Sequence, residues 1–385
     1  YIIGAMYYFG QGVHPDFNEA AKWYLLAAEQ GISLAQSALG GMYFRGEGVA
    51  QSYGESAKWF RLAADQGNAD AQATLGAMYA NGHGLPLDFQ EAEQWYRLAA
   101  DQGAPLAQAA LGGMYLRGDG VLQDYSEAAK WFRLAAEQGV AIAQSALGAL
   151  YFDGNGRPQD YREAAKWFRL AADQGAPLAQ AALGGMYFRG QGVPQDYSEA
   201  AKWFRLAADQ GVVNAQSALG QMYSNGQWLS VDYKEASKWY RLAANQGDVA
   251  AQVGLAFMYA SGQGVLQDYK EAVKWFRLAA EQGDALAQAS LGLSYEHGSG
   301  VDPNQVIAYA LYNLSAANDP SNEVAVSSRD RLASKLSSKD IDIAQSLARD
   351  MNGKGNLLAV LDKFVGSGLK KAGRSATNRA PKPSK

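Results

Sequence analysis

Hydrophobic and polar positions recur along this chain with a period of 36 residues. Within one period, residues 104–139, apolar side chains return every three or four residues in two separate stretches, which predicts two short amphipathic helices. The first runs from about Pro105 to about Tyr115, and the second begins at Asp124 and ends before Gly139. A pair of short helices cannot bury both apolar stripes alone, so consecutive pairs must stack on one another.

Glycines and cap residues predict where these helices begin and end. Gly118 and Gly120 supply the backbone freedom that ends the first helix and turns the chain. At the start of the second helix, the carboxylate of Asp124 can accept from free backbone amides, and we expect Glu127 to reach back to the cap. The same spacing recurs at Asp16/Glu19, Ser52/Glu55, Asp88/Glu91, Asp160/Glu163, Asp196/Glu199, Asp232/Glu235 and Asp268/Glu271.

The composition follows from the repeat. On a helical wheel, Trp131 shares a stripe with Ala128, Leu134 and Ala135, so we expect one tryptophan per repeat to form core rather than a carbohydrate or cation site. A glutamine that recurs from Gln36 onward is expected to make structural hydrogen bonds. The tryptophans in register are Trp23, Trp59, Trp95, Trp131, Trp167, Trp203, Trp239 and Trp275.

The segment from Ala107 to Gly139 fits the pattern A-Q-x-x-L-G-x-x-Y-x-x-G-x-G-V-x-x-D-Y-x-E-A-x-K-W-F-x-x-A-A-x-x-G, as does Ala179 to Gly211. This pattern resembles the Sel-one-like repeat, and its Gly-x-Gly loop and period distinguish it from the plain tetratricopeptide repeat. The resemblance implies an all-α fold, a right-handed, tetratricopeptide-like α-solenoid superhelix of helix-turn-helix repeats. It also implies a non-enzymatic bacterial scaffold or adaptor that binds other proteins.

The absence of cysteine from the sequence limits the chemistry. It excludes disulfides, thiolate zinc sites and cysteine nucleophiles, and the three histidines lie far apart, so we expect neither a cofactor nor a metal. Some cysteine-rich relatives of the family are described as binding or hydrolysing β-lactams, and a hydrolase or small-molecule binder of that kind is the alternative. The Gly-x-Gly loops lack the longer pattern and preceding strand of a dinucleotide site.

Three segments are expected along the chain. Residues 1–318 form the solenoid, with a partial first repeat, eight full units and an atypical last one; residues 319–351 are capping helices, and 352–385 are a basic, disordered tail. A short amphipathic helix over Leu357 to Leu369 would precede the disordered part. The tail is a second alternative function, a tether to anionic membrane or nucleic acid, although no aromatic side chain follows Phe364 for base stacking.

The chain begins inside a repeat and without an initiator methionine, so we expect a fragment or a processed product. Periplasm, secretion and cytoplasm all remain open as locations. The net charge of −4 argues against a main body that binds polyanions.

Binding specificity is expected where the repeats differ, because recurring residues serve the repeat itself. Solenoids bind along their concave surface, here the face of the first helix opposite its packed stripe, which suits an extended peptide or a partner helix. Aromatic side chains beside arginines are typical of interfaces, although these groups could instead fill the curve between repeats. The candidates are Phe44, Arg45, Arg117, Phe152, Phe188, Arg189, Gln221, Trp228, Phe257 and Leu293.

Overall fold

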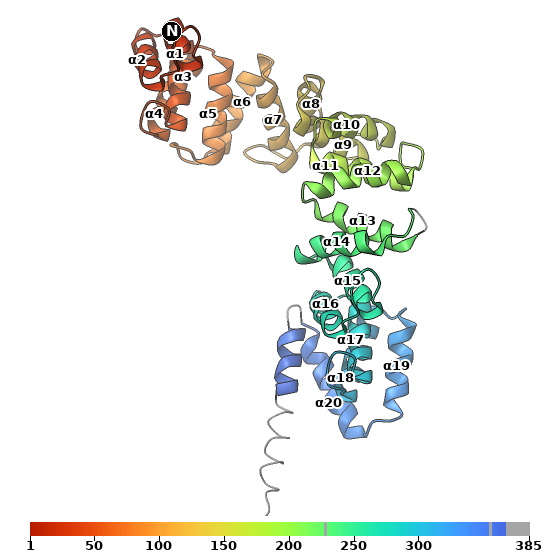
Figure 1. Cartoon of the computed structure of the whole chain (residues 1–385). Coiled ribbons are helices and arrows are strands. Elements are labelled where there is room, and N and C mark those ends of the chain that lie inside the picture. Colours follow the sequence, from red (N-terminus) through yellow and green to blue (C-terminus); the bar gives the residue numbers. More distant parts are fainter. Residues whose placement is uncertain (227–228, 354–355, 367–385) are drawn as a thin grey trace, which may run out of the picture. The chain divides into compact units, whose positions relative to one another are not determined.

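The computed structural model describes residues 1–226, 229–353 and 356–366, and all regular secondary structure in these ranges is helical. The chain divides into two compact units, unit 1 (Tyr1–Asp196) and unit 2 (Tyr197–Lys385). Within each unit, first and second helices of the repeat alternate along the chain, and each packs on its neighbours (Figure 1). The all-α repeat solenoid predicted from the sequence is confirmed.

In unit 1 the first helices of the repeats have odd numbers and the second helices have even numbers. The helices are α1 (Ile2–Phe9), α2 (Phe17–Glu29), α3 (Ser33–Arg45), α4 (Tyr53–Asp65), α5 (Ala69–Asn81), α6 (Phe89–Asp101), α7 (Pro105–Arg117), α8 (Tyr125–Glu137), α9 (Ala141–Asp153), α10 (Tyr161–Asp173) and α11 (Pro177–Arg189).

Unit 2 begins with a second helix and ends with helices that depart from the repeat pattern. Its helices are α12 (Tyr197–Asp209), α13 (Val213–Asn225), α14 (Tyr233–Asn245), α15 (Val249–Ser261), α16 (Tyr269–Glu281), α17 (Ala285–His297), α18 (Gln305–Asn318), α19 (Glu323–Ala333) and α20 (Ser338–Met351). Residues 357–366 are also helical.

The second helices begin at the predicted cap, but only half of the expected capping box forms. The Oδ1 atom of Asp124 accepts from the backbone N–H groups of Ser126 at 2.8 Å and Glu127 at 3.0 Å. The N–H of Asp124 itself donates to the carbonyl of Tyr115 at 3.0 Å. Glu127 pairs with Lys130 on the exposed side of α8. The expectation that Glu127 returns to the cap was therefore wrong, because the loop already satisfies that donor.

The buried stripe of the second helix also differs from the predicted one. In α8 the buried residues are Ala128, Ala129, Phe132, Ala135 and Ala136. Leu134 is 44% exposed and Trp131 is half-buried, so the predicted stripe was displaced by about one residue. The tryptophans belong fully to the core only in unit 2, at Trp203, Trp239 and Trp275.

A glycine in the first helix explains why phenylalanine rather than tryptophan fills the core. The ring of Phe132 lies so close to Gly112 that a Cβ atom there would come within 2.8 Å of ring carbon Cδ1. The same close approach joins Gly148 to Phe168 and Gly220 to Tyr240. The aromatic residue that follows the tryptophan therefore sets the packing of each helix pair.

The recurring glutamine is structural, as predicted. Gln108 is buried, and its Nε2 atom donates to the carbonyl of Ala100 at 3.1 Å. Its Oε1 atom accepts from Nε2 of Gln138, the C-cap residue of the following second helix α8, at 2.8 Å. Because both the donor and the acceptor of the buried Gln108 amide are hydrogen-bonded, it links three helices at little net cost in folding free energy.

The C-terminal end of unit 2 is closed by segments outside the repeat pattern. Helices α19 and α20 contact α18, and Leu357 and Leu361 of the helix at 357–366 are buried. The guanidinium of Arg277 pairs with the carboxylate of Asp362 at 2.5 Å. Most of the predicted basic tail, from residue 367 onward, lies outside the described residues.

Candidate functional site

The predicted site residues lie at three neighbouring positions of the first helices, which we call the variable face. It consists of the positions occupied by Gly41, Phe44 and Arg45 in α3 and of the equivalent residues in α5, α7, α9, α11, α13, α15 and α17. All ten predicted site residues except Trp228 fall on this face. Trp228 lies outside the described residues.

In unit 1 a small residue lets an arginine lie back along its own helix. A Cβ atom added to Gly113 would come within 3.2 Å of Nη1 of Arg117, four residues later. The same arrangement places Arg45 over Gly41 and Arg189 over Gly185. The glycines at this position therefore set the direction of the arginines.

Two of these three arginines are paired with carboxylates of the same repeat. Nε of Arg45 lies 2.8 Å from Oε2 of Glu47, and Nε of Arg117 lies 2.6 Å from Oδ2 of Asp119. Burial opposes ionisation of Glu47, but hydrogen bonds from Tyr8 and Arg45 outweigh it and lower the pKa of this carboxyl group. The charges of Arg45 and Arg117 are thus partly neutralised before any partner arrives.

Arg189 differs because Gln191 stands where the paired repeats carry an acid. Its Nη1 atom donates to the carbonyl of Gly185 at 3.4 Å, and no ion pair of Arg189 occurs within the described residues. Of the three predicted arginines, Arg189 is the one with charge still available to a partner.

The phenylalanines of the variable face in unit 1 pack against aromatic residues of their own repeats. The ring of Phe44 lies 5.0 Å from that of Tyr53, and Tyr53 stacks on His83 at 5.2 Å. The ring of Phe152 lies 5.1 Å from that of Tyr161. Both phenylalanines are half-buried, so at these positions the residues largely fill space between helices.

In unit 2 the variable face is more apolar and contains a pocket. Phe257 and Leu293, which are 42% and 46% exposed, replace the glycine or alanine of unit 1, and Gln221 at the same position in α13 is exposed. Phe257 and Leu293 line one pocket of about 130 Å³ between α15, α16 and α17. The other lining residues, which the sequence did not single out as a site, are Ala260, Tyr269, Ala272, Phe276, Ser290, Ser294 and Ser299.

The sequence of the repeat identifies the family to which the chain belongs. The sequence model of the Sel1 repeat matches nine consecutive segments, and these cover nearly all of residues 1–320. The chain belongs to the Sel1 repeat family. The matched segments are 1–32, 33–68, 69–103, 105–140, 141–175, 177–212, 213–248, 249–284 and 285–320.

Two solved structures resemble this Sel1 repeat protein along most of its length. One is c5321, a protective antigen present in uropathogenic Escherichia coli strains that displays an SLR fold; it is 32% identical, with 100% of this chain and 87% of that chain covered and a TM-score of 0.66. The other is a Sel1 repeat protein from Oxalobacter formigenes, which is 35% identical, with 81% and 89% covered and a TM-score of 0.58. No curated protein matches the chain.

The family membership predicted from the sequence is thus confirmed, and it implies a general role. Sel1 repeat proteins are tetratricopeptide-like solenoids that typically serve as protein-interaction modules and are generally not enzymes. In the described part of this Sel1 repeat protein, no group of three or more His, Asp or Glu residues could hold a metal ion. No helix among those described is long and apolar enough to cross a membrane.

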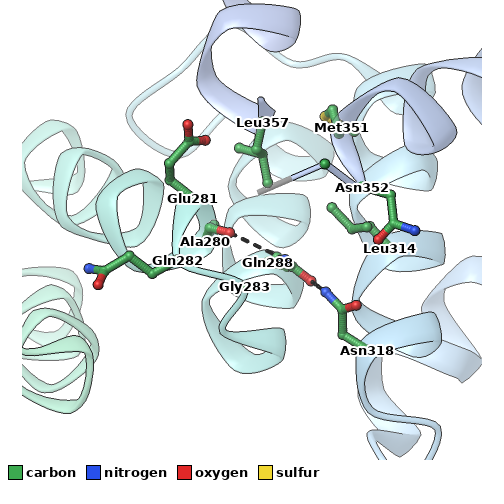
Figure 2. A pocket seen from close by; sticks show the side chains of 11 residues that line it. Ala280, Glu281, Gln282, Gly283, Gln288, Leu314, Asn318, Met351, Asn352 and Leu357 are labelled. Carbon is green, nitrogen blue, oxygen red and sulfur yellow. Dashed lines mark hydrogen bonds between the residues drawn. The ribbon is translucent and has the colours of Figure 1, made fainter. Parts of the chain in front are cut away.

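A second pocket marks the point where the ladder of glutamines ends in this Sel1 repeat protein. Asn318 stands in the place of Gln282 one repeat later, and its Nδ2 atom donates to Oε1 of Gln288 at 3.0 Å (Figure 2). Glu281 and Leu357 line the same pocket of about 190 Å³. Asn352 and Gly353 also line this pocket, to which we assign no ligand.

Proposed function

We propose that this protein is a scaffold or adaptor that binds a partner polypeptide along its variable face and performs no chemistry of its own. One observation carries the proposal. In unit 2 the face exposes two large apolar side chains, Phe257 and Leu293, around a pocket, at a position where the other repeats fold with glycine, alanine or glutamine.

The repeat does not need a large side chain at the position of Phe257 and Leu293. Gly113 and Gly185 occupy the equivalent position in α7 and α11, and both helices form over the full 13 residues, so the fold does not require a large side chain there. Contiguous exposed apolar surface around a pocket is unfavourable in water and is characteristic of protein-binding sites. The residue types of unit 2 therefore favour a surface that is covered by another polypeptide.

The arginines of unit 1 have a smaller part in this proposal. Arg45 and Arg117 already contact carboxylates, whereas Arg189 has charge available, so we expect Arg189 to add more to partner binding than the other two. The half-buried rings of Phe44, Phe152 and Phe188 would form the apolar floor beside these arginines. Gln221 would contribute a polar contact at the start of the unit 2 face.

The test is partner capture from the native source, followed by affinity measurement with the purified partner. The double substitution Phe257→Ala and Leu293→Ala should weaken affinity by at least about tenfold, as expected for exposed apolar anchors. The matched control is Leu242→Ala with Leu278→Ala, which removes leucines of similar exposure, 41% and 38%, from second helices. Equal affinity of the two double variants, both folded, would contradict the proposal.

A further inference from the structure

The pocket in unit 2 lies where three other repeats carry a phenylalanine. Phe44, Phe152 and Phe188 occupy one position of the variable face, and Ala260 occupies the equivalent position in α15. Ala260 lines the pocket. The pocket is therefore found at a position where the side chain stops at Cβ.

The backbone around Ala260 keeps the arrangement found around Phe44. In α3 and its following loop, Nε2 of Gln51 donates to the carbonyl of Phe44 at 2.9 Å and to the hydroxyl of Tyr53 at 3.3 Å. At the equivalent place, Nε2 of Gln267 donates to the carbonyl of Ala260 at 2.8 Å and to the hydroxyl of Tyr269 at 2.9 Å. The hydrogen bonds around this position are therefore the same in unit 2, and what is missing there is the phenyl ring.

The walls of the pocket are the residues that such a ring contacts elsewhere in the protein. The ring of Phe152 lies 5.1 Å from Tyr161 at an interplanar angle of 63°, and 6.5 Å from Phe168. Three repeats later, the same two places are taken by Tyr269 and Phe276, both of which line the pocket. A phenyl group in the pocket would therefore find an edge-to-face partner in Tyr269, an arrangement that aromatic rings prefer. It would also lie near the ring of Phe276, which already makes an edge-to-face contact with Phe257 at 5.1 Å.

The size and opening of the pocket fit one aromatic side chain of another polypeptide. Apolar cavities of about 150 Å³ bind benzene in other proteins, and this pocket measures about 130 Å³. The exposed side chains of Phe257 and Leu293 continue the apolar surface beyond the pocket, so a chain that carries the ring would also find contacts on either side.

We propose that the pocket between α15, α16 and α17 binds a phenylalanine side chain of a partner polypeptide, which takes the place of the phenylalanine that this repeat lacks. This inference rests on the proposed function and names the anchor that the partner presents. None of the described residues that line the pocket carries a charged side chain, which suits an uncharged anchor.

The substitution Ala260→Phe tests the inference, because it supplies the ring from within. The probe is the blocked tripeptide acetyl-Gly-Phe-Gly-amide, titrated into the full chain while the methyl resonances of Ala272 and Leu293 are followed by NMR. We expect saturable shifts with the wild-type chain and none with Ala260→Phe. The leucine tripeptide should bind about threefold to tenfold more weakly than the phenylalanine tripeptide, since it lacks the ring contacts.

Ala80→Phe is the matched control. Ala80 occupies the same position in unit 1, but Ala77 and Gly113 stand where unit 2 has Phe257 and Leu293, so this variant should leave the titration unchanged. Thermal unfolding of both variants checks that each is folded. A cooperative transition at or above the wild-type temperature is expected for Ala260→Phe.

Four results would overturn the inference: no saturable binding by the wild-type chain, unchanged binding by folded Ala260→Phe, equal binding of the leucine tripeptide, or self-association that Ala260→Phe abolishes. The last would identify a second copy of this chain as the occupant. The proposed function fails separately, if Phe257→Ala with Leu293→Ala leaves the affinity for the purified partner unchanged. If the tripeptide does not bind but the double variant loses affinity for the purified partner, only the inference of a phenylalanine anchor is contradicted, and the proposed function stands.

Discussion

The variable faces of unit 1 and unit 2 share one backbone design and differ in surface chemistry. In unit 1, Gly113 and Gly185 allow arginines to lie along the helix, and phenylalanines such as Phe152 fill the gap beside the next helix. In unit 2, Phe257 and Leu293 are partly exposed at the pocket, where the ring of Phe257 contacts that of Phe276, and Ala260 leaves the gap open. Positions not used for stacking can therefore change from polar and filled to apolar and open without altering the repeat.

The residues that hold the repeat together are common to both units. The glutamine ladder appears in unit 1 at Gln108 and in unit 2 at Gln252, with the same hydrogen bonds to a carbonyl and to the next glutamine. Because nearest-neighbour contacts determine the stability of a solenoid, specificity and stability can be separated on different positions.

The largest expected effect on stability comes from removing the buried phenylalanine of one repeat, and it tests whether both units are built on the same kind of core. Phe132→Ala in unit 1 and Phe276→Ala in unit 2 should each destabilise the unit that contains them by about 3–5 kcal/mol, because each ring is buried. Chemical denaturation would measure this change. Leu134→Ala, at a half-exposed position, should cost much less. A large difference between the two phenylalanine variants would show that the cores of the two units differ in how much they depend on this ring.

A smaller effect is expected in α17, where Glu296 takes the place of the phenylalanine, alanine, leucine or serine that the other repeats carry at this position of the variable face. The hydrogen bond from Arg331 lowers the pKa of the Glu296 carboxyl group from its ordinary value of 4.5; burial opposes this shift, and the hydrogen bond from Tyr312 adds to it. Nη2 of Arg331 lies 2.9 Å from Oε2 of Glu296, and the hydroxyl of Tyr312 donates to the same oxygen at 3.0 Å. Glu296→Gln should therefore lose roughly 1.5–3 kcal/mol near neutral pH.

The stability difference between the wild-type chain and Glu296→Gln should depend on pH. A carboxyl group with a lowered pKa stabilises the folded state above its unfolded pKa, and this contribution disappears as the pH falls through the folded pKa. The wild-type chain should thus be more stable than Glu296→Gln at pH 7, and the difference should shrink below about pH 4.5. Urea denaturation at a series of pH values measures it. A difference that does not change with pH would show that the ionised carboxylate is not the cause.

Filling the pocket should stabilise unit 2 modestly. Ala260→Phe is expected to add about 0.5–1.5 kcal/mol through ring contacts with Tyr269 and Phe276. The measurement is the change in unfolding free energy against wild type, with Ala80→Phe as the reference. Destabilisation by Ala260→Phe would show that the space around Ala260 does not accommodate a phenyl ring, although the equivalent space around Phe44 does.

The smallest effect concerns the arginines of unit 1. Gln191→Asp gives Arg189 the carboxylate that Arg117 has in Asp119, and Asp119→Gln removes it from Arg117. Exposed pairs of this kind contribute about 0–1 kcal/mol, so unfolding should hardly change. Partner affinity should fall for Gln191→Asp and remain or rise for Asp119→Gln. The opposite pattern would show that free charge on this face does not contribute to binding.

The sequence predicts most of the fold, because a strict period and repeated glycines leave one way to divide the chain. It does not distinguish Trp131 from Phe132 as the core residue, since two adjacent aromatic residues differ by only one step on a wheel. The decision depends on Gly112, a residue on another helix that makes room for the Phe132 ring.

The candidate site is harder to predict for a related reason. Phe257 and Leu293 stand out in the sequence as large residues at a small position, and the structure brings them to one pocket. Ala260 gives no such signal, because an alanine in a helix is ordinary. The open space beside Ala260 becomes evident only from the structure, where Phe44 and Phe152 show which side chain the equivalent position accommodates.

The most direct test of the central claim compares Ala260→Phe with Ala80→Phe for affinity toward the partner captured from the native source. Isothermal titration with the purified partner measures both. We predict that Ala260→Phe weakens binding by at least about tenfold while Ala80→Phe binds as the wild-type chain does, with both variants folded. Equal affinity of the two variants would contradict the claim that the open pocket of unit 2 is where this protein recognises its partner.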